Sequence, residues 1–139
     1  MTTSREVRFA LLGAGVAAAY HREAIVANAQ LGARLAAIGH HDPSRFDAIS
    51  TRFGAPCVTY ETILSDPTVD CVCICTPSGQ HEEQAVAAAA AGKHVLVEKP
   101  MALTKVGADR MIEACAAAGV QLGVVLQRRA TPVVERIKQ

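Results

Sequence analysis

The sequence predicts an α/β domain with a doubly wound parallel sheet, and three observations predict it. Short apolar segments alternate with alanine-rich amphipathic segments, which is the pattern of βαβ units. The 139 residues are the length of one domain with a single core. Right-handed crossovers between the expected strands would place them in the order 3-2-1-4-5-6.

The first half of the chain repeats a short apolar strand followed by a helical segment, and both complete units are close to minimal length. Apolar runs mark the strands, and apolar residues at helical spacing mark the helices. In chain order, the expected elements are a strand at 7–12, a helix at 16–30, a strand at 34–38, a helix at 44–53, a strand at 57–59 and a helical turn at 61–64.

The second half follows the same pattern around a strand that is apolar on both faces and is therefore expected at the centre of the sheet. Two of its helices are expected to stop at Gly92 and Gly119, because glycine relieves the left-handed conformation that ends many helices. The expected elements are a strand at 70–75, a helix at 78–91, a strand at 94–97, a helix from Thr104 to Gly119 and a strand at 120–126.

The bulk composition excludes several classes of protein. Charged residues make up 19% of the chain and the net charge is +1, so neither a disordered tail nor a nucleic-acid surface is indicated. The apolar runs are too short to span a bilayer, and residues 1–7 lack the features of a signal sequence. We expect a soluble cytoplasmic protein without a nucleic-acid or membrane partner.

The five cysteines suit a reducing compartment, because their number is odd and three of them alternate along one strand. Cys71, Cys73 and Cys75 would point to one face of that strand, where buried packing explains them better than a metal. His40 and His41 lack a partner at metal spacing, and neighbouring residues on an extended chain point opposite ways. We expect no metal site.

The turn after the first strand carries the pattern GxGxxA, formed by Gly13, Gly15 and Ala18. Gly13 allows a tight turn, Gly15 lets the backbone approach a pyrophosphate, and Ala18 is small enough for close packing of helix and strand. Val16 opens the helix, whose free N–H groups and dipole favour anions. Because strand, spacing and helix occur together, the sequence predicts a Rossmann-type dinucleotide site.

The end of the second strand departs from the usual pattern, which places Asp or Glu about 20 residues further on to bind the ribose hydroxyls. Here His40 stands at that position, and Asp42 follows beside Pro43. We interpret Asp42 first as a helix cap, with a capping box of Ser44 and Asp47 as the alternative, and second as a ribose ligand. A 2′-phosphate would not be repelled by His40, so His40, His41 or Arg45 could contact it. NAD and NADP are equally compatible with the sequence.

The loops after the first, fourth and fifth strands should meet where the strand order reverses. They carry GxGxxA followed by His21, then Thr76-Pro77 with His81, then Gly92-Lys93-His94-Val95-Leu96-Val97-Glu98-Lys99-Pro100. This series resembles the glucose-fructose oxidoreductase / inositol dehydrogenase (Gfo/Idh/MocA) family over nearly the whole chain. The Glu-Lys-Pro element is its most specific part.

The resemblance implies an NAD(P)-dependent dehydrogenase that transfers a hydride between a nicotinamide and a sugar, polyol or related alcohol. Lys99 would lie near the reacting carbon and relay the hydroxyl proton, since a partly dry cleft beside a cationic ring disfavours its ammonium form. Glu98 would hold Lys99 in place, and Pro100 would fix the turn. Thr76 and Pro77 would line the nicotinamide side. His81 would either line that pocket as a catalytic group or sit in the first turn of its helix.

The resemblance also implies a second, substrate-binding domain. Residues 1–126 would form the NAD(P)-binding domain, and residues 127–139 would begin the crossing into a C-terminal domain that this chain does not contain. The chain would therefore bind nucleotide but be inactive alone. Exposed apolar surface, including Val133, Val134 and Ile137, leads us to expect a homo-oligomer.

Two other functions remain open at this point. A non-catalytic dinucleotide-binding regulator has the same fold, although the presence of Lys99 favours an enzyme. A methyltransferase using S-adenosylmethionine would have a similar sheet, but the motif spacing and the Glu-Lys-Pro loop disfavour it.

Overall fold

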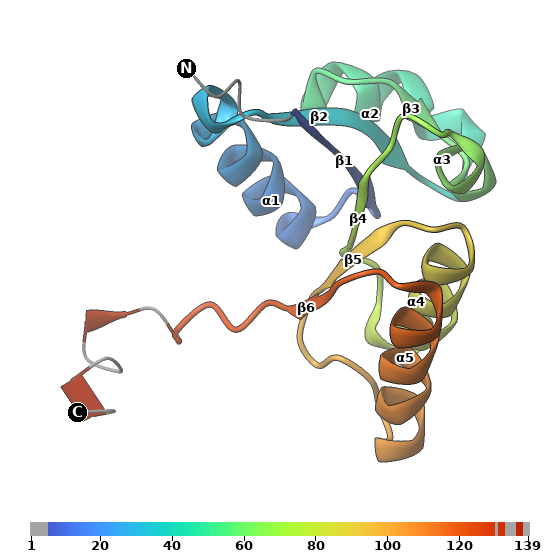
Figure 1. The fold of residues 1–139 in the computed structure, drawn as a ribbon. Helices are drawn as coiled ribbons and strands as arrows, with labels where there is room; N and C mark the ends of the chain where they lie inside the picture. The colour runs from blue at the N-terminus through green and yellow to red at the C-terminus, as the bar shows by residue number, and fades with distance from the viewer. Residues whose placement is uncertain (1–5, 130, 133–135, 138–139) are drawn as a thin grey trace.

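The computed structural model describes residues 6–129, 131–132 and 136–137. Within these residues, one parallel sheet of six strands has the order β3-β2-β1-β4-β5-β6 (Figure 1), which confirms the predicted topology. The strands are β1 (Val7–Leu12), β2 (Ala33–Gly39), β3 (Cys57–Val58), β4 (Cys71–Ile74), β5 (His94–Val97) and β6 (Leu122–Val124).

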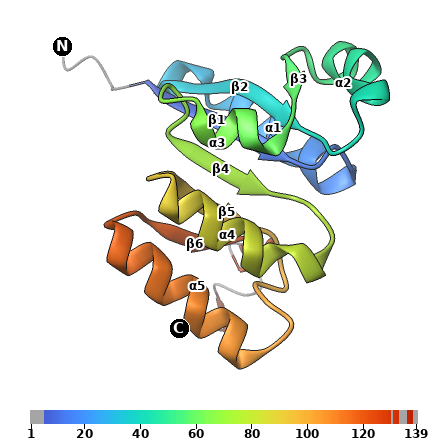
Figure 2. The ribbon, with the colours of Figure 1, turned by 90° about the vertical axis from the view of Figure 1, so that its right-hand side faces the viewer.

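Helices cover both faces of the sheet. One face packs against α1 and α2, and the other packs against α3, α4 and α5, which lie toward the viewer in Figure 2. The helices are α1 (Val16–Ala27), α2 (Phe46–Phe53), α3 (Tyr60–Ser65), α4 (His81–Ala90) and α5 (Lys105–Ala118), with short 3-10 turns η1 (Ala29–Leu31), η2 (Pro43–Arg45) and η3 (Ser78–Gln80). No helix in the described ranges has the length and apolar character needed to cross a bilayer.

The central strands divide their side chains between the two halves of the core. In β1, Leu11 packs toward α1 and α2, whereas Ala10 and Leu12 pack toward the opposite helices. This alternation follows from the two-residue period of a strand. All four residues of β4 are buried, as expected for a strand covered on both faces. The alanines of α4 let that helix lie close to the sheet, because three of them are fully buried.

Several elements are shorter than predicted, and two of them show why. The helix expected over 16–30 ends at Ala27, where the side-chain amide of Asn28 donates to the carbonyl oxygen of Ala24 at 2.8 Å and η1 follows. The strand expected over 120–126 covers only Leu122–Val124. The N–H of Val120 instead donates to the Cys115 carbonyl at the end of α5, and β5 stops pairing after Val97.

A buried lysine connects the α3–β4 loop to the start of β5. Lys93 is 5% exposed, and its Nζ donates to the carbonyl oxygens of Asp66 and Val69, the latter at 2.9 Å. The Asp66 carboxylate accepts from the N–H and hydroxyl of Thr68, and these bonds lower the pKa of Asp66. Lys93 therefore has a structural role, because two backbone acceptors of the α3–β4 loop depend on its buried ammonium group.

We expect Lys93→Met to lower the free energy of unfolding by roughly 2 to 3 kcal/mol, because two carbonyl oxygens lose a charged donor. Urea unfolding followed by circular dichroism measures this change. Lys105→Met is the matched control, because the Lys105 side chain is 90% exposed and pairs only with Asp109 on the helix surface. The control should stay within about 0.5 kcal/mol of the parent. Equal midpoints for both variants would contradict the assignment of Lys93.

Candidate functional site

Two cavities lie side by side at the carboxyl ends of the strands. The first, which we call the turn cavity, has a volume of about 650 Å³ and borders the β1–α1 turn and the end of β2. The second, the Lys99 cavity, has about 640 Å³ and lies between α1 and the loops after β4, β5 and β6. Both are lined by Val16, Cys75, Thr76 and Pro77. One elongated molecule could therefore extend from one cavity to the other across the switch point between β1 and β4.

Gly13 is required by the fold. It has a φ of +97°, and a Cβ at this position would lie 2.9 Å from the carbonyl oxygen of Cys75. Its N–H donates to the Gly39 carbonyl oxygen at 3.0 Å. The turn thus fits tightly between the ends of β2 and β4, and any side chain would displace it.

Gly15 has the opposite environment. No atom lies within 4 Å of the place that its Cβ would occupy, so the space beside it is open. It is the N-cap of α1 and supplies no side-chain acceptor to the helix, whose first turn also lacks acidic residues. Ala18 is fully buried against the sheet. The open space at a helix N-terminus fits a pyrophosphate, which the backbone N–H groups can bind.

The end of β2 places two histidines together. His40 is buried, and its Nδ1 accepts from the backbone N–H of Asp42 at 3.1 Å. The rings of His40 and His41 stack with their centroids 4.5 Å apart. The expectation that the two side chains point opposite ways was wrong, because the strand ends at Gly39 and the chain bends at once. Both rings line the turn cavity.

Asp42 acts as a cap. Its carboxylate accepts from the backbone N–H of Ser44 at 3.0 Å and from the Ser44 hydroxyl at 2.7 Å, and these bonds lower the pKa of Asp42. The first interpretation is thereby confirmed, and the Ser44 hydroxyl donates to Asp42 instead of capping a helix with Asp47. Asp42 is absent from the residues that line either cavity within the described chain.

Two arginines border the turn cavity, and only Arg45 was expected there. Arg52, in the last turn of α2, donates from Nη1 to the carbonyl oxygen of Ala14 at 3.0 Å. Its Cζ lies 5.1 Å from the centroid of the Phe53 ring. The sequence could have indicated Arg52, because it follows Arg45 by seven residues, and residues seven apart lie two helical turns apart on one face. Tyr60, also missed, lines the cavity from the start of α3.

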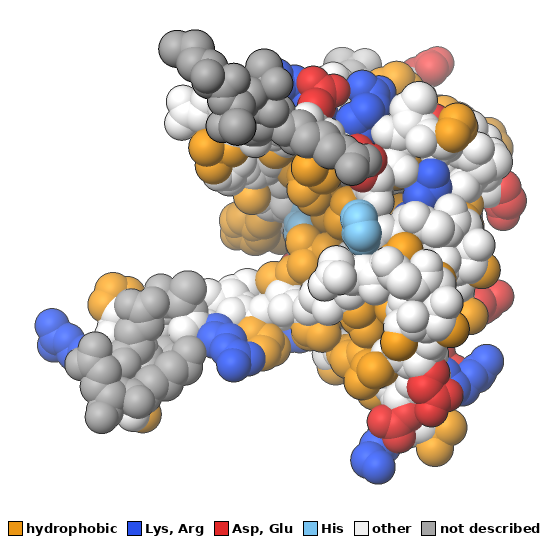
Figure 3. Space-filling model, viewed as in Figure 1, with side chains coloured by type: hydrophobic (Ala, Val, Ile, Leu, Met, Phe, Trp, Pro, Cys, Tyr) orange, Lys and Arg blue, Asp and Glu red, His pale blue; other side chains and the backbone are white. Residues whose placement is uncertain are grey.

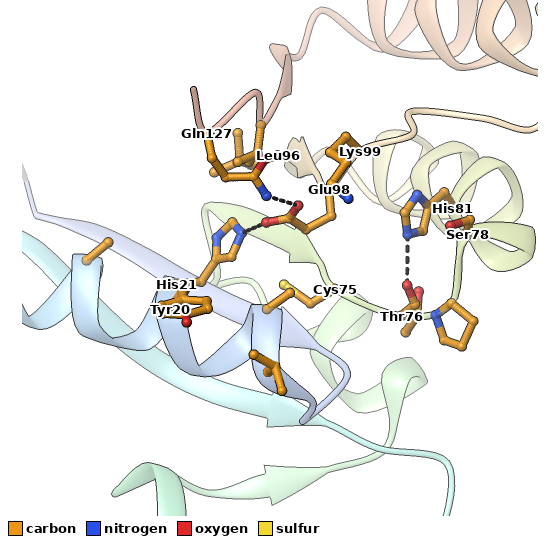
Figure 4. Close-up of a pocket in the computed structure, with 15 residues that line it drawn as sticks. Tyr20, His21, Cys75, Thr76, Ser78, His81, Leu96, Glu98, Lys99 and Gln127 are labelled. Atoms are coloured by element: carbon orange, nitrogen blue, oxygen red, sulfur yellow. Dashed lines mark hydrogen bonds and ion pairs between the residues drawn. The ribbon is translucent and has the colours of Figure 1, made fainter. Parts of the chain in front are cut away.

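Glu98 does not hold Lys99, contrary to expectation. Its Oε1 lies 2.8 Å from Nε2 of His21, and its Oε2 accepts from the side-chain amide of Gln127 at 3.3 Å (Figure 4). The carboxylate turns toward α1 because these two partners approach it from α1 and from the segment after β6. Lys99 is exposed at the wall of its cavity, not in the partly dry cleft that the resemblance suggested.

His81 lines the Lys99 cavity but is only 1% exposed. Its Nδ1 lies 2.9 Å from the carbonyl oxygen of Pro100, and its Nε2 lies 2.8 Å from that of Thr76. Both ring nitrogens are therefore engaged by backbone groups. This geometry favours a positioning role in which His81 joins the loop after β4 to the loop after β5.

Thr76 and Cys75 are two further polar residues in the wall that both cavities share. The Thr76 hydroxyl donates to Oε1 of Gln84 at 2.5 Å. Burial, followed by the nearby charge of Glu98, raises the pKa of Cys75 to about 12. The Cys75 thiol stays protonated at neutral pH and is a poor nucleophile. Within the described residues, no three His, Cys, Asp or Glu side chains gather as metal ligands would.

Known proteins resemble this chain in sequence and in fold. Residues 7–126 match the Gfo/Idh/MocA family, described as an oxidoreductase family with an NAD-binding Rossmann fold. Inositol 2-dehydrogenase of Acidothermus cellulolyticus is 37% identical over 82% of this chain and 34% of that protein. D-xylose 1-dehydrogenase (NADP(+)) 2 of Haloferax volcanii is 36% identical over 73% of this chain and 32% of that protein.

A solved structure gives the same result. The WlbA dehydrogenase of Bordetella pertussis, in complex with NADH and UDP-GlcNAcA, has a TM-score of 0.89 and 36% identity. The match covers 96% of this chain and 41% of that one. The chain thus spans about a third to two fifths of the length of these relatives. With the GxGxxA turn and the Glu-Lys-Pro loop at the same edge of a 3-2-1-4-5-6 sheet, the chain belongs to the Gfo/Idh/MocA oxidoreductase family and carries its NAD-binding Rossmann fold.

Proposed function

We propose that this chain is the nucleotide-binding part of an NAD(P)-dependent dehydrogenase that acts on a sugar, a polyol or a related alcohol. The observation that carries the proposal is the open space beside Gly15, which lies next to a cavity lined by Lys99. A dinucleotide has a charged pyrophosphate in its middle and a reactive ring at one end. The two cavities offer an anion site at a helix N-terminus and a lysine beyond it.

In this proposal, the residues divide by cavity. Gly13, Gly15, Val16 and Ala18 form the pyrophosphate site, with Gly13 and Ala18 shaping it and the N–H groups of α1 binding. His40 and Arg45 lie at the ribose, where Asp42 supports the loop through its bonds to Ser44. Thr76, Pro77, Glu98 and Lys99 lie at the nicotinamide.

The proposed chemistry needs one group to handle a proton. When bound, the nicotinamide supplies the hydride acceptor or donor for a carbon that carries a hydroxyl. Lys99 would hydrogen-bond that hydroxyl and relay its proton, which is general acid–base catalysis. His81 would hold the loops that contain Thr76 and Pro100 together through its two ring nitrogens. The pair of Glu98 and His21 would hold the end of β5 beside Lys99 in place.

The relatives' greater length supports placing substrate contacts beyond this chain. We propose that residues 1–126 form the nucleotide-binding domain and that residues 127–139 lead toward a second domain. Val133 and Val134 lie outside the described residues, and Ile137 is exposed. Hydrophobic side chains also gather in the hollow above the outstretched C-terminal segment (Figure 3). These surfaces are the basis for proposing a homo-oligomer, and the unpaired cysteines suit the cytoplasm.

A non-catalytic regulator is the second candidate, because it would bind the dinucleotide through the same turn. The exposure of Lys99 to its cavity favours the enzyme, since a regulator has no need for a proton-carrying group there.

We expect Gly15→Val to abolish NADH binding without unfolding the chain, because its side chain would enter only the open space. The matched variant Gly13→Val should unfold or strongly destabilise the chain, because its Cβ meets Cys75. Calorimetric titration with NADH and thermal melts measure the two effects. Unchanged affinity in a folded Gly15→Val variant would refute the pyrophosphate site.

In a complete enzyme that contains this domain, Lys99→Met should lower kcat roughly 10²- to 10⁴-fold, the usual contribution of a general acid–base group. The dissociation constant for NADH should change by less than about threefold, because affinity arises mainly at the turn. Lys105→Met on the surface of α5 is the control and should leave both quantities unchanged. Full turnover without Lys99 would disprove the proton relay.

The 139-residue chain by itself should bind NADH weakly, self-associate and turn over no sugar or polyol. Positioning of the reacting carbon can contribute on the order of 7 to 11 kcal/mol, and we place the positioning groups beyond this chain. Sedimentation velocity and a dehydrogenase assay with a polyol panel test this. Leu126→Ser should weaken association, because Leu126 is half exposed. A strict monomer would contradict the proposed self-association, and clear turnover would contradict the proposed inactivity of the isolated chain.

A further inference from the structure

We propose that the turn cavity selects NADP over NAD, through a 2′-phosphate pocket built by Arg45, Arg52, His40 and His41. The inference rests on the proposed function, because it assumes that the adenosine ribose lies at the end of β2. Family membership does not decide the matter, and the side chains around this cavity do.

The lining of the turn cavity is rich in basic side chains. Two guanidinium groups and two imidazole rings border the turn cavity, and none of its lining residues in the described chain is Asp or Glu. An NAD-selective pocket instead presents a carboxylate that accepts from the ribose hydroxyls and repels a phosphate. The lining of this cavity has the charge that a 2′-phosphate requires.

The acid nearest to His40 in the sequence, Asp42, is engaged outside the cavity. The Asp42 carboxylate is two residues from His40, but the N–H and hydroxyl of Ser44 both donate to its Oδ1. The acid is therefore committed to the start of η2 and does not line the cavity. Oδ1 of Asp42 is thus taken up by the cap, and the side chain lies outside the lining of the cavity.

Contacts within the protein hold three of the four basic side chains in place, those of Arg52, His40 and His41. The bond from Arg52 Nη1 to the Ala14 carbonyl oxygen ties α2 to the phosphate turn, and the Phe53 ring lies under the guanidinium group. Nδ1 of His40 has two contacts, and the shorter one is a hydrogen bond that it accepts from the Asp42 N–H. Nε2 is therefore the ring nitrogen that can donate. Stacking holds His41 against His40. An ordered set of donors binds a phosphate better than mobile side chains, because less entropy is lost.

The two arginines reach the turn cavity from different elements. Arg45 follows directly from the capped turn that begins at Asp42, so it belongs to the ribose end of the site. Arg52 reaches the same cavity from the last turn of α2, beside the phosphate turn. A 2′-phosphate between them would receive N–H donors from both sides, in addition to those of the histidines.

The test compares dissociation constants of NADPH and NADH for the chain by calorimetric titration. The parent should bind NADPH at least tenfold more tightly than NADH. Arg45→Ala and Arg52→Ala should each weaken NADPH binding roughly tenfold or more, as expected for the loss of a charge-assisted bond, and should weaken NADH binding by a clearly smaller factor. Lys105→Ala, a change in an exposed cation on α5, is the control and should alter neither constant.

His40→Asp provides the reverse test. A carboxylate at this position should reduce the preference for NADPH about a hundredfold, because it repels the phosphate and accepts from a free 2′-hydroxyl. Competition with 2′,5′-ADP and 5′-AMP isolates the phosphate itself, and only 2′,5′-ADP should compete strongly in the parent.

Several outcomes would overturn the inference. Equal affinities of the parent for NADPH and NADH would refute the selectivity and leave the proposed dinucleotide binding intact. Equal losses of both cofactors in the arginine variants would place these residues at the pyrophosphate and refute the 2′-phosphate pocket. Failure of the parent to bind either cofactor would refute the proposed function and the selectivity together.

Discussion

The close approach of the β1–α1 turn to the ends of β2 and β4 is the constraint on which the rest of the site depends. Gly13 donates to the Gly39 carbonyl at the end of β2, and the N–H of Cys75 donates to Leu12 at 2.8 Å. Because Gly13 has no side chain, three strand ends meet within hydrogen-bond distance. The helix N-terminus, the loop after β2 and the loop after β4 are therefore presented at one edge, and both cavities open there.

The two cavities differ in chemistry although they share a wall. The turn cavity has basic and hydrogen-bonding side chains beside a helix N-terminus, which suits the phosphates of a nucleotide. The Lys99 cavity has many apolar neighbours from α1 and β5 in addition to its polar residues, which suits a ring system. One bound molecule with a charged middle and a reactive end would satisfy both.

Partly buried hydrogen bonds hold the wall of the Lys99 cavity. His21 joins α1 to Glu98 after β5, and Gln127 joins the same carboxylate to the segment after β6. His81 joins the loops after β4 and β5 through two carbonyl oxygens. These bonds connect segments far apart in the sequence, so the position of Lys99 depends on α1, α4 and β6 together.

The strand order, the tight β1–α1 turn and the loops that face the cavities could be predicted from the sequence alone, because hydrophobic periodicity and glycine spacing are local properties of the chain. The sequence also identified Asp42 as a cap, which depends only on residues 42 to 44. The hydrogen-bond partners of the polar side chains depend on the tertiary structure. Arg52 is 38 residues from Ala14, and Glu98 is 77 residues from His21, so neither contact follows from a local pattern. The stacking of His40 on His41 likewise arises only where the chain bends after β2. Side-chain partners across a sheet edge depend on how its loops fold over one another, and local sequence does not encode that arrangement.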